Sequence, residues 1–258
     1  MNWTYWLSVC NTRCNSWNYY VHMAHRVHTS FQTYNVNPKY PYDTYEPLWN
    51  CNTRERIPSA PGDGAKFACG IDAYNTKNNV TIYSIGSNGN TMFEEGMHAR
   101  MPHSKIITFD PTLSETARKN VLKHNYITLK EVGIGSGRPF YAKDHSIYSF
   151  FGHVHAYNTM VLTTAFYIHG IPNILKIDIE GSEYGLFNMI TCNNIKHVDQ
   201  ILIEVHGKNP EPIFQWFDQC NFLMFNKEPN IWGCKGILCG EYSFINAHFA
   251  YTVFKFFR

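Results

Sequence analysis

The sequence predicts an α/β protein with a doubly wound, mostly parallel seven-stranded sheet whose last strand runs antiparallel, preceded by an irregular N-terminal extension. Three observations support this prediction. From about residue 61, short apolar segments alternate with segments of helical periodicity, which is typical of a parallel sheet covered by helices. Several of the helical segments begin with capping signals. Glycine or acidic residues follow several of the apolar segments, as they do where strands end in binding loops.

The expected strands are short runs rich in Ile, Val, Tyr and Phe. They span residues 80–85, 105–109, 127–132, 174–179, 200–205, 222–225 and 248–256. The first five are separated by helical segments, so we expect them to be parallel. Residues 248–256 follow 222–225 and are expected to be the antiparallel strand.

Helices are expected between these strands. Their start signals lie at Thr91, Thr112, Thr159, Ser182 and Asn209. At Thr91 and Thr112 the signal is a capping box, in which Glu94 and Glu115 follow three residues later. Asn209-Pro210 places a proline at the first position of a helix, where its missing N–H is tolerated.

Two segments show no sustained period. Residues 1–60 are rich in Asn, Tyr, Trp, Pro and His, and we interpret them as an irregular N-terminal extension with one helix near residues 18–28. A single domain is then expected over residues 61–258. Within that domain, residues 133–155 are expected to cross the binding face as loops.

The charge and hydropathy pattern narrows the class of partner. Net charge is +2 with His neutral and there is no run of Lys or Arg, so we expect no nucleic-acid partner. No apolar run reaches the roughly 20 residues of a membrane-spanning helix, so no transmembrane segment is expected in this chain. Residues 1–10 lack the basic start of a signal peptide.

Cysteines and glycosylation signals favour the secretory pathway. The eight cysteines lack the paired CxxC spacing of a zinc ribbon. Glycosylation sequons begin at Asn2 and Asn79. Together these features favour a secretory-pathway or extracellular protein with disulfides over a cytoplasmic one. The sequence leaves the pairing of the cysteines open.

Candidate ligand-binding residues follow three of the expected strands, and ligands bind beyond the carboxyl ends of parallel strands. After the first strand comes the glycine loop, which we define as Gly86, Ser87, Asn88 and Gly89. Its glycines let the backbone approach a ligand, and the following helix start offers N–H groups. Asp110 follows the second strand, 24 residues after Gly86, where nucleotide-binding folds hold ribose hydroxyls.

The fourth strand carries two acids near its end. Asp178 and Glu180 alternate with apolar residues, so both carboxylates are expected on one side of the strand. A carboxylate on a buried strand needs a partner or a function, which favours Asp178 as a site residue. Glu183 opens the next helix and is interpreted mainly as a first-turn acid.

Five segments together resemble a known family. They are 62–66 (GDGAK), 83–93 (YSIGSNGNTMF), 109–111 (FDP), 175–183 (LKIDIEGSE) and 203–206 (IEVH). Residues 61–258 resemble S-adenosylmethionine-dependent methyltransferases of the FkbM-like, methyltransferase-like class. The most specific match is 175–183, which is similar to the KIDVEGAE-type hallmark of that family.

This resemblance implies a Rossmann-like fold and S-adenosylmethionine as the cofactor. It implies that the glycine loop holds the methionine part of the cofactor and that Asp110 binds the ribose hydroxyls. Asp178 would face the cofactor or the acceptor as a binding and catalytic residue. The chemistry that the resemblance favours is O-methylation of a small molecule, a glycan or a lipid head group.

His206 is the expected proton acceptor, because it follows the fifth strand and a neutral imidazole can take a proton from a hydroxyl. No metal is expected. The alternative, in which Asp178, Glu180, Glu204 and His206 bind Mg, Mn or Zn, is weaker. It requires the fifth strand to persist to His206, so that Glu204 and His206 share a side.

Two other functions stay open. A nicotinamide-dependent oxidoreductase would share the first strand–helix–strand units, but its G-x-G-x-x-G motif is absent. A secreted, catalytically silent binding domain with the same fold is the second alternative. Its support is Ser84, which stands where the family commonly has an acid, together with a loop of two glycines. The sequence does not set the oligomeric state.

Overall fold

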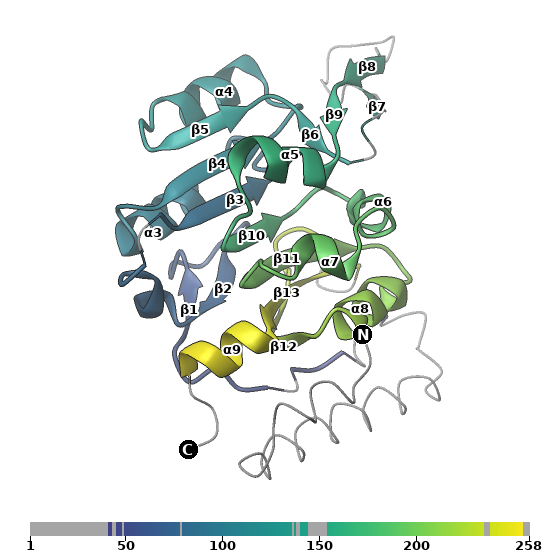
Figure 1. Ribbon diagram of the computed structural model, residues 1–258. Coiled ribbons are helices and arrows are strands. Elements are labelled where there is room, and N and C mark those ends of the chain that lie inside the picture. Colours follow the sequence, from purple (N-terminus) through teal and green to yellow (C-terminus); the bar gives the residue numbers. More distant parts are fainter. Residues whose placement is uncertain are drawn as a thin grey trace, which may run out of the picture.

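In the computed structural model, the molecule is built around a seven-stranded sheet with helices on both of its faces (Figure 1). The structure describes residues 41–42, 45–47, 49–77, 79–135, 137, 140–143, 154–234 and 238–254. The helix expected near residues 18–28 lies outside these ranges. The strands of the sheet are β3 (Thr81–Ile85), β4 (Lys105–Phe109), β5 (Ile127–Lys130), β10 (Ile174–Ile177), β11 (Gln200–His206), β12 (Phe222–Pro229) and β13 (Cys239–Asn246).

The strand order is β12-β13-β11-β10-β3-β4-β5. The pairs from β11 to β5 are parallel, whereas β13 runs antiparallel to both β11 and β12. Counted along the chain, the order is 6-7-5-4-1-2-3. This confirms the predicted doubly wound, mostly parallel sheet with one antiparallel last strand.

The identity of that last strand was predicted wrongly. Residues 248–256 do not form it, because Ala247–Phe254 are helix α9 and the antiparallel strand is β13. The side chain of Asn246 accepts hydrogen bonds from the backbone N–H groups of His248 (2.9 Å) and Phe249 (3.4 Å), which is how Asn starts a helix. Strand β13 is buried along its whole length, so it lacks the alternation that marks a half-exposed strand.

Two apolar layers cover the sheet. The helices are α3 (Met92–Arg100), α4 (Glu115–Leu122), α5 (Leu162–His169), α6 (Glu183–Phe187), α7 (Cys192–Ile195), α8 (Glu211–Gln219), α9 and the 3-10 helix η1 (Ile71–Tyr74). One layer contains buried residues of α5, α6, α7 and α8, with Phe217 fully buried. The other contains those of η1, α3 and α9, with Met97 fully buried. Alternate residues of β3, β10 and β11 enter the two layers, as strand geometry requires.

The two predicted capping boxes do not form. Thr91 precedes α3 as expected, but its hydroxyl donates to Glu95 at 2.6 Å and accepts no backbone N–H at the helix start. Helix α4 begins two residues later than expected, because its cap is Ser114, whose hydroxyl accepts the N–H of Ala117 at 3.2 Å. Thr112 is left free to bond to Asp110.

Smaller sheets flank the main one. Strands β1 (Arg54–Ile57), inside the predicted N-terminal extension, and β2 (Lys66–Cys69) form an antiparallel pair. The expectation of loops over residues 133–155 is wrong in part. That segment holds β6 (Gly133–Ile134), which pairs with β9 (Thr159–Met160), and β7 (Phe140–Lys143), which pairs with β8 (Val154–Tyr157).

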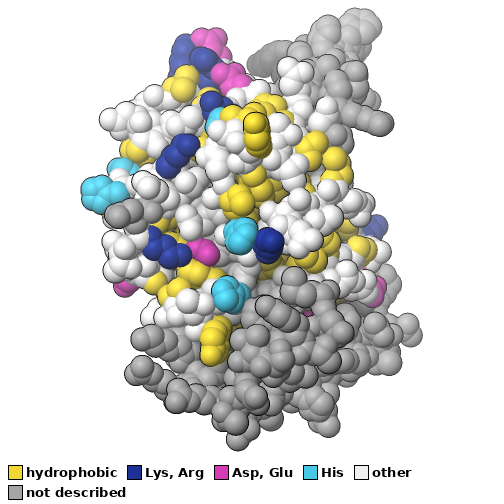
Figure 2. All heavy atoms as spheres, viewed as in Figure 1, with side chains coloured by type: hydrophobic (Ala, Val, Ile, Leu, Met, Phe, Trp, Pro, Cys, Tyr) yellow, Lys and Arg dark blue, Asp and Glu magenta, His cyan; other side chains and the backbone are white. Residues whose placement is uncertain are grey.

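Three disulfides link parts of the described chain. They are Cys51–Cys69, Cys192–Cys220 and Cys234–Cys239, and no free cysteine occurs in the described ranges. On the face shown in Figure 2, Lys and Arg side chains are scattered among hydrophobic and polar ones. Within those same ranges, no helix has both the length and the apolar character needed to span a bilayer.

Candidate active site

The glycine loop is tied down by the carboxylate of Asp110. Asp110 Oδ2 accepts the backbone N–H groups of Ser87 and Asn88, each at 2.8 Å, and the Ser87 hydroxyl at 3.3 Å. Its other oxygen accepts the N–H and hydroxyl of Thr112 at 2.9 and 2.8 Å. Asp110 is only 3% exposed. The acid at the end of β4 therefore organises the loop at the end of β3.

Gly86 is required by a close approach between two strand ends. Its φ is 79°, and a Cβ at this position would lie 1.7 Å from the carbonyl oxygen of Asp178. The Gly86 carbonyl in turn accepts a hydrogen bond from the Lys176 ammonium. Glycine is required at position 89 for a different reason, because a Cβ there would lie 2.5 Å from the Cβ of Ala117 on α4. The loop is thus packed against both β10 and α4.

One face of the sheet changes from apolar to polar toward the carboxyl ends of its strands. Ile174 and Leu202 lie in the apolar layer of that face, whereas Lys176 and Glu204, two residues further along the same strands, are buried and polar. Lys66 on β2 covers this polar region. The ammonium of Lys66 lies 2.7 Å from Glu241 and 3.3 Å from Asp178.

Asp178 carries the negative charge that balances Lys66. Burial alone would raise the pKa of Asp178, but the nearby Lys66 and Lys176 lower it to about 2. Burial raises the pKa of Glu241 to about 8, although Lys66 opposes this shift. Glu241 therefore keeps a proton at neutral pH, while Asp178 is ionised. A carboxylate with so low a pKa is a weak proton acceptor, so its contribution is electrostatic.

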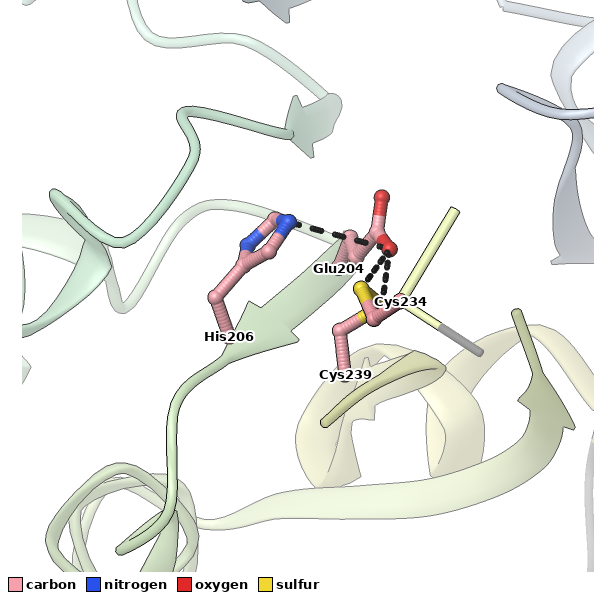
Figure 3. Close-up of side chains that lie close together, drawn as sticks. All are labelled: Glu204, His206, Cys234 and Cys239. Atoms are coloured by element: carbon pink, nitrogen blue, oxygen red, sulfur yellow. Dashed lines mark hydrogen bonds and ion pairs between the residues drawn. A yellow bond between two sulfur atoms is a disulfide. The ribbon is translucent and has the colours of Figure 1, made fainter. Parts of the chain in front are cut away.

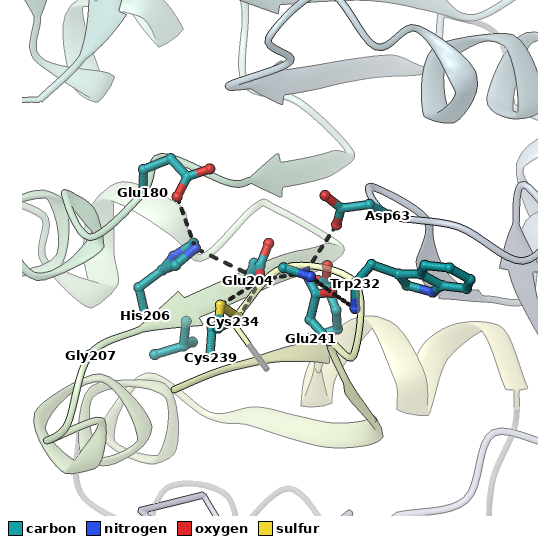
Figure 4. Close-up of a disulfide and its surroundings, with 12 residues drawn as sticks. Asp63, Glu180, Glu204, His206, Gly207, Trp232, Cys234, Cys239 and Glu241 are labelled. Atoms are coloured by element: carbon teal, nitrogen blue, oxygen red, sulfur yellow. Dashed lines mark hydrogen bonds and ion pairs between the residues drawn. A yellow bond between two sulfur atoms is a disulfide. The ribbon is translucent and has the colours of Figure 1, made fainter. Parts of the chain in front are cut away.

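His206 ends β11 and is surrounded by carboxylates. Figure 3 shows Glu204 beside it, and Figure 4 adds Glu180. Its Nδ1 lies 3.0 Å from Oε1 of Glu183, whose side chain is fully buried. Its Nε2 lies 3.4 Å from Glu180 and 3.7 Å from Glu204. Burial alone would lower the pKa of His206, but the hydrogen bond to Glu183 and the charges of Glu183, Glu204 and Glu180 raise it to about 9.

Glu204 lies deeper than His206. Burial and the charge of Asp178 raise its pKa to about 7. Its Oε1 accepts a hydrogen bond from the side-chain amide of Asn230 at 2.7 Å. Since β11 persists to His206, Glu204 and His206 do share a side of the strand.

The predicted site residues form one strip along the carboxyl edge of the sheet. It runs from Asp110 after β4, through the glycine loop after β3, to Asp178 after β10 and His206 on β11, which is the order of these strands in the sheet. The side chains of Asp178, Glu180 and His206 bring ligand atoms within 4.8 Å of one another.

Glu180 does not share a strand with Asp178, although the sequence predicted that it would. Strand β10 ends at Ile177, so the alternation does not reach Glu180, which has φ 52° and a side chain 87% exposed. Sequence reasoning also missed Lys66 as the partner of Asp178, and Glu241 as the second partner of Lys66. Lys66 lies in the 62–66 segment that carries the family resemblance, and this was the available signal. Glu241 had none, because its strand was not predicted.

A cavity of about 240 Å³ lies on the Glu241 side of the buried polar region. Its lining includes Arg56, Asp63, Glu228, Asn230, Trp232 and Glu241. Through Glu241 and Asn230, the cavity adjoins the polar layer that contains Lys66 and Glu204. Figure 4 shows Asp63, Trp232 and Glu241 grouped on the far side of Glu204 from His206.

Comparison with known proteins shows which family the chain matches. Residues 10–246 match a family described as a methyltransferase domain. No curated protein sequence matches the chain. Among solved structures, an uncharacterized protein from Listeria monocytogenes serotype 4b is 12% identical with a TM-score of 0.41 over 69% of this chain, and the chain spans 65% of the length of that protein.

Two further solved structures show the same level of likeness. Precorrin-6y C5,15-methyltransferase from Geobacter metallireducens is 8% identical, with a TM-score of 0.39 over 69% of this chain and 85% of that one. The fibrillarin pre-rRNA processing protein from Methanococcus jannaschii is 8% identical, with a TM-score of 0.40 over 76% and 84%. Likeness this distant carries no argument about activity.

The family match covers most of the chain and decides between the two enzyme classes that the early strands allow. It favours a methyltransferase over a nicotinamide-dependent oxidoreductase. The chain belongs to the methyltransferase domain family and is an S-adenosylmethionine-dependent methyltransferase.

Proposed function

We propose that this protein transfers a methyl group to a hydroxyl oxygen, with His206 as the proton acceptor. The observation that carries the proposal is the setting of His206 at the end of β11. Buried Glu183 holds Nδ1 at 3.0 Å, so Nε2, which faces Glu180 and Glu204, is the atom that exchanges the proton. Because the pKa of His206 is raised, most molecules of the free protein carry this proton at pH 7. Only the deprotonated fraction of His206 can accept a proton from the acceptor hydroxyl.

The residues around Asp110 fit the ribose of S-adenosylmethionine. Two of the groups that bond to this carboxylate are hydroxyls, those of Ser87 and Thr112. Ribose hydroxyls can replace them without disturbing the backbone bonds that hold the loop. Asp110 would then bind the ribose, and Ser87, Asn88 and the two glycines would line the methionine part. The cofactor, when bound, supplies an activated methyl group on a sulfonium.

The protein's own part in the reaction is to position the acceptor, exclude water and take one proton. Asp178, held by Lys66 and Lys176, keeps a fixed negative charge beside the glycine loop. The cavity of about 240 Å³ next to Glu241 has room for a small polar group. This supports a small molecule, a glycan or a lipid head group as the acceptor.

We also propose the family branch and the compartment. The segment 175–183 favours the FkbM-like branch of methyltransferases. Three disulfides and an exposed Asn79 in a glycosylation sequon support the secretory pathway or the cell exterior. A mass shift after enzymatic removal of N-linked glycans, absent in Asn79→Gln, tests the sequon. Retention of the chain in the cytosol with reduced cysteines would contradict this localisation.

Calorimetric titration followed by transfer of a labelled methyl group tests the function. S-adenosylmethionine and its demethylated product are expected to bind, and His206→Gln is expected to bind them as the wild type does while losing at least about 100-fold in kcat. His197→Gln, at an exposed histidine, is the matched control and should keep full activity.

Two results would contradict the proposal. If neither form of the cofactor binds, the chain is a silent binding domain. If the label arrives on nitrogen or carbon with no product on oxygen, across alcohol, sugar and phospholipid-head-group acceptors, the assignment of O-methylation is wrong.

A further inference from the structure

The Cys234–Cys239 disulfide lies against Glu204 and His206 (Figure 3). Glu204 Oε1 is 2.7 Å from Cys239 Sγ and 3.7 Å from Cys234 Sγ. The same oxygen is 3.7 Å from His206 Nε2. The four donor atoms of these residues all lie within 4.8 Å of one another. Sulfurs joined in a disulfide carry no proton, so these are contacts and not hydrogen bonds.

Two of these side chains are oriented as metal ligands are. A metal-binding histidine generally donates its other ring N–H to a carboxylate, and His206 places Nδ1 at 3.0 Å from the buried Glu183. That contact leaves Nε2 as the ring nitrogen that faces the cluster and offers its lone pair to a metal once its proton leaves. Glu204 is held by the amide of Asn230 at 2.7 Å, which fixes the carboxylate in the same way.

We propose that reduction of the Cys234–Cys239 disulfide turns this cluster into a tetrahedral zinc site, with two thiolate sulfurs, His206 Nε2 and Glu204 Oε1 as ligands. Sulfur, imidazole and carboxylate are the donors that Zn²⁺ takes. A dithiol reductant supplies two electrons and two protons: its own disulfide forms as the Cys234–Cys239 bond breaks. Binding of the ion then releases the two thiol protons and the proton on His206 Nε2.

The distances suit such a site. Zinc–ligand bonds of about 2.0 to 2.3 Å place ligand atoms roughly 3.3 to 3.8 Å apart in a tetrahedron. The separations from Glu204 Oε1 to Cys234 Sγ and to His206 Nε2, both 3.7 Å, already fall in this range. Only Cys239 Sγ, at 2.7 Å, is too close, and opening the S–S bond frees it to move away.

Of the three described bridges, this one also constrains the chain least. Its cysteines are 5 residues apart, against 18 for Cys51–Cys69 and 28 for Cys192–Cys220. The stabilisation that a disulfide gives through the unfolded state grows with the length of the loop it closes. Reduction at Cys234–Cys239 therefore removes the smallest part of the stability supplied by the described bridges.

The site goes beyond the proposed function and does not depend on it. If His206 is also the base, however, a zinc ion on Nε2 occupies the lone pair that accepts the proton. The reduced, zinc-loaded form is then inactive, and the oxidised form is active.

Cobalt(II) is the probe for the site, because a cobalt–thiolate bond gives a charge-transfer absorption. We expect full-length protein reduced with a phosphine, without oxygen, to bind one Co²⁺ with this band and to lose it when Zn²⁺ is added. Oxidised protein should give no band. The variant C234S/C239S should give none after reduction, whereas the matched control C192S/C220S should keep it. H206N should weaken Co²⁺ binding at least about tenfold.

Two results overturn the proposal: a folded, reduced wild type without the band, or a band that survives in C234S/C239S. Circular dichroism establishes whether the reduced chain is folded. If it is not, Cys234→Ala decides without reductant, because it frees the Cys239 thiol while the two longer bridges stay intact. This variant should show a cobalt–thiolate band from one sulfur, and its absence refutes the site.

Discussion

Asp110 accepts the backbone N–H of Ser87 at 2.8 Å, so the acid at the end of β4 holds the loop at the end of β3. A second bond of equal length reaches it from the N–H of Asn88. The carboxylate therefore has a role in the protein before any ligand arrives. Its role in binding ribose stays a prediction, and the two roles can be separated by mutation.

Asp110→Ala removes the backbone hydrogen bonds from Ser87, Asn88 and Thr112 and leaves these three partly buried N–H groups without that partner. We expect a loss of about 2 to 4 kcal/mol in the free energy of unfolding, measured by urea denaturation. Asp110→Asn keeps one oxygen for the loop, so it should lose less stability but should still weaken S-adenosylmethionine binding at least about tenfold. Cofactor affinity that is unchanged in Asp110→Asn would mean that the residue only supports the loop.

Gly86→Ala tests the approach between the loop and β10. The added methyl would lie 1.7 Å from the Asp178 carbonyl, in a backbone conformation with φ 79° that disfavours side chains. We expect destabilisation of more than about 3 kcal/mol and loss of cofactor binding. Gly185→Ala is the matched control, since a Cβ there meets nothing within 4 Å, and it should be neutral or slightly stabilising. Equal thermal stability of the two variants would contradict this account.

Lys66→Met tests how much the buried contacts of Lys66 with Asp178 and Glu241 stabilise the fold. Removing the ammonium leaves Asp178 with the more distant Lys176 alone and takes from Glu241 its hydrogen-bond donor. Breaking a buried ion pair in this way costs about 3 to 5 kcal/mol. Lys119→Met is the control, because the Lys119–Glu115 pair is exposed, with side chains 71% and 78% accessible, and should be worth less than about 0.5 kcal/mol. Denaturant midpoints measure both. Similar losses in the two variants would show that Lys66 contributes no more than a surface lysine.

The pairing of Asp178 predicts a dependence of stability on pH. Its pKa falls from its ordinary value of 3.8 to about 2 in the folded protein, so the folded state binds fewer protons than the unfolded state between these values. The stabilisation, on the order of 2 kcal/mol, is present above pH 4 and is lost as the pH falls toward 2. Urea unfolding at a series of pH values should show this slope in the wild type and a smaller one in Asp178→Asn. An unchanged slope would mean that another acid is responsible.

Local sequence signals were sufficient for the parallel part of the sheet. Strands β3, β4, β10 and β11 are short apolar runs followed by Gly or Asp, and periodicity places them correctly. Because parallel strands end at one edge, the order of the sheet then brings Asp110, Asp178 and His206 into one strip. The periodicities of strands and helices, together with the rule that parallel strands end at one edge, thus predict most of the candidate site.

Long-range pairing explains what the sequence could not predict. Strand β13 contains buried Glu241 and Ser243, whose partners Lys66 and the Phe67 carbonyl lie on β2, more than 170 residues earlier in the chain. Without those partners, two polar residues argue against a buried strand. Strand β10 stops early because Glu180 adopts a positive φ, and no residue pattern marks a glutamate for that conformation.

Glu183→Gln tests whether this buried acid positions His206 through its charge. Oε1 of Glu183 accepts the backbone N–H groups of Ile179 (3.2 Å) and Gly181 (3.3 Å) as well as facing His206, and a Gln oxygen can keep all three contacts. Only the negative charge is lost, so the hydrogen bond to the imidazole weakens while the turn persists. We expect kcat to fall about tenfold, with KM for the cofactor and the melting temperature nearly unchanged. Glu115→Gln, at an exposed acid, should leave kcat, KM and the melting temperature unchanged. A parallel loss of melting temperature and cofactor affinity, with kcat preserved at saturation, would show that Glu183 serves the turn alone.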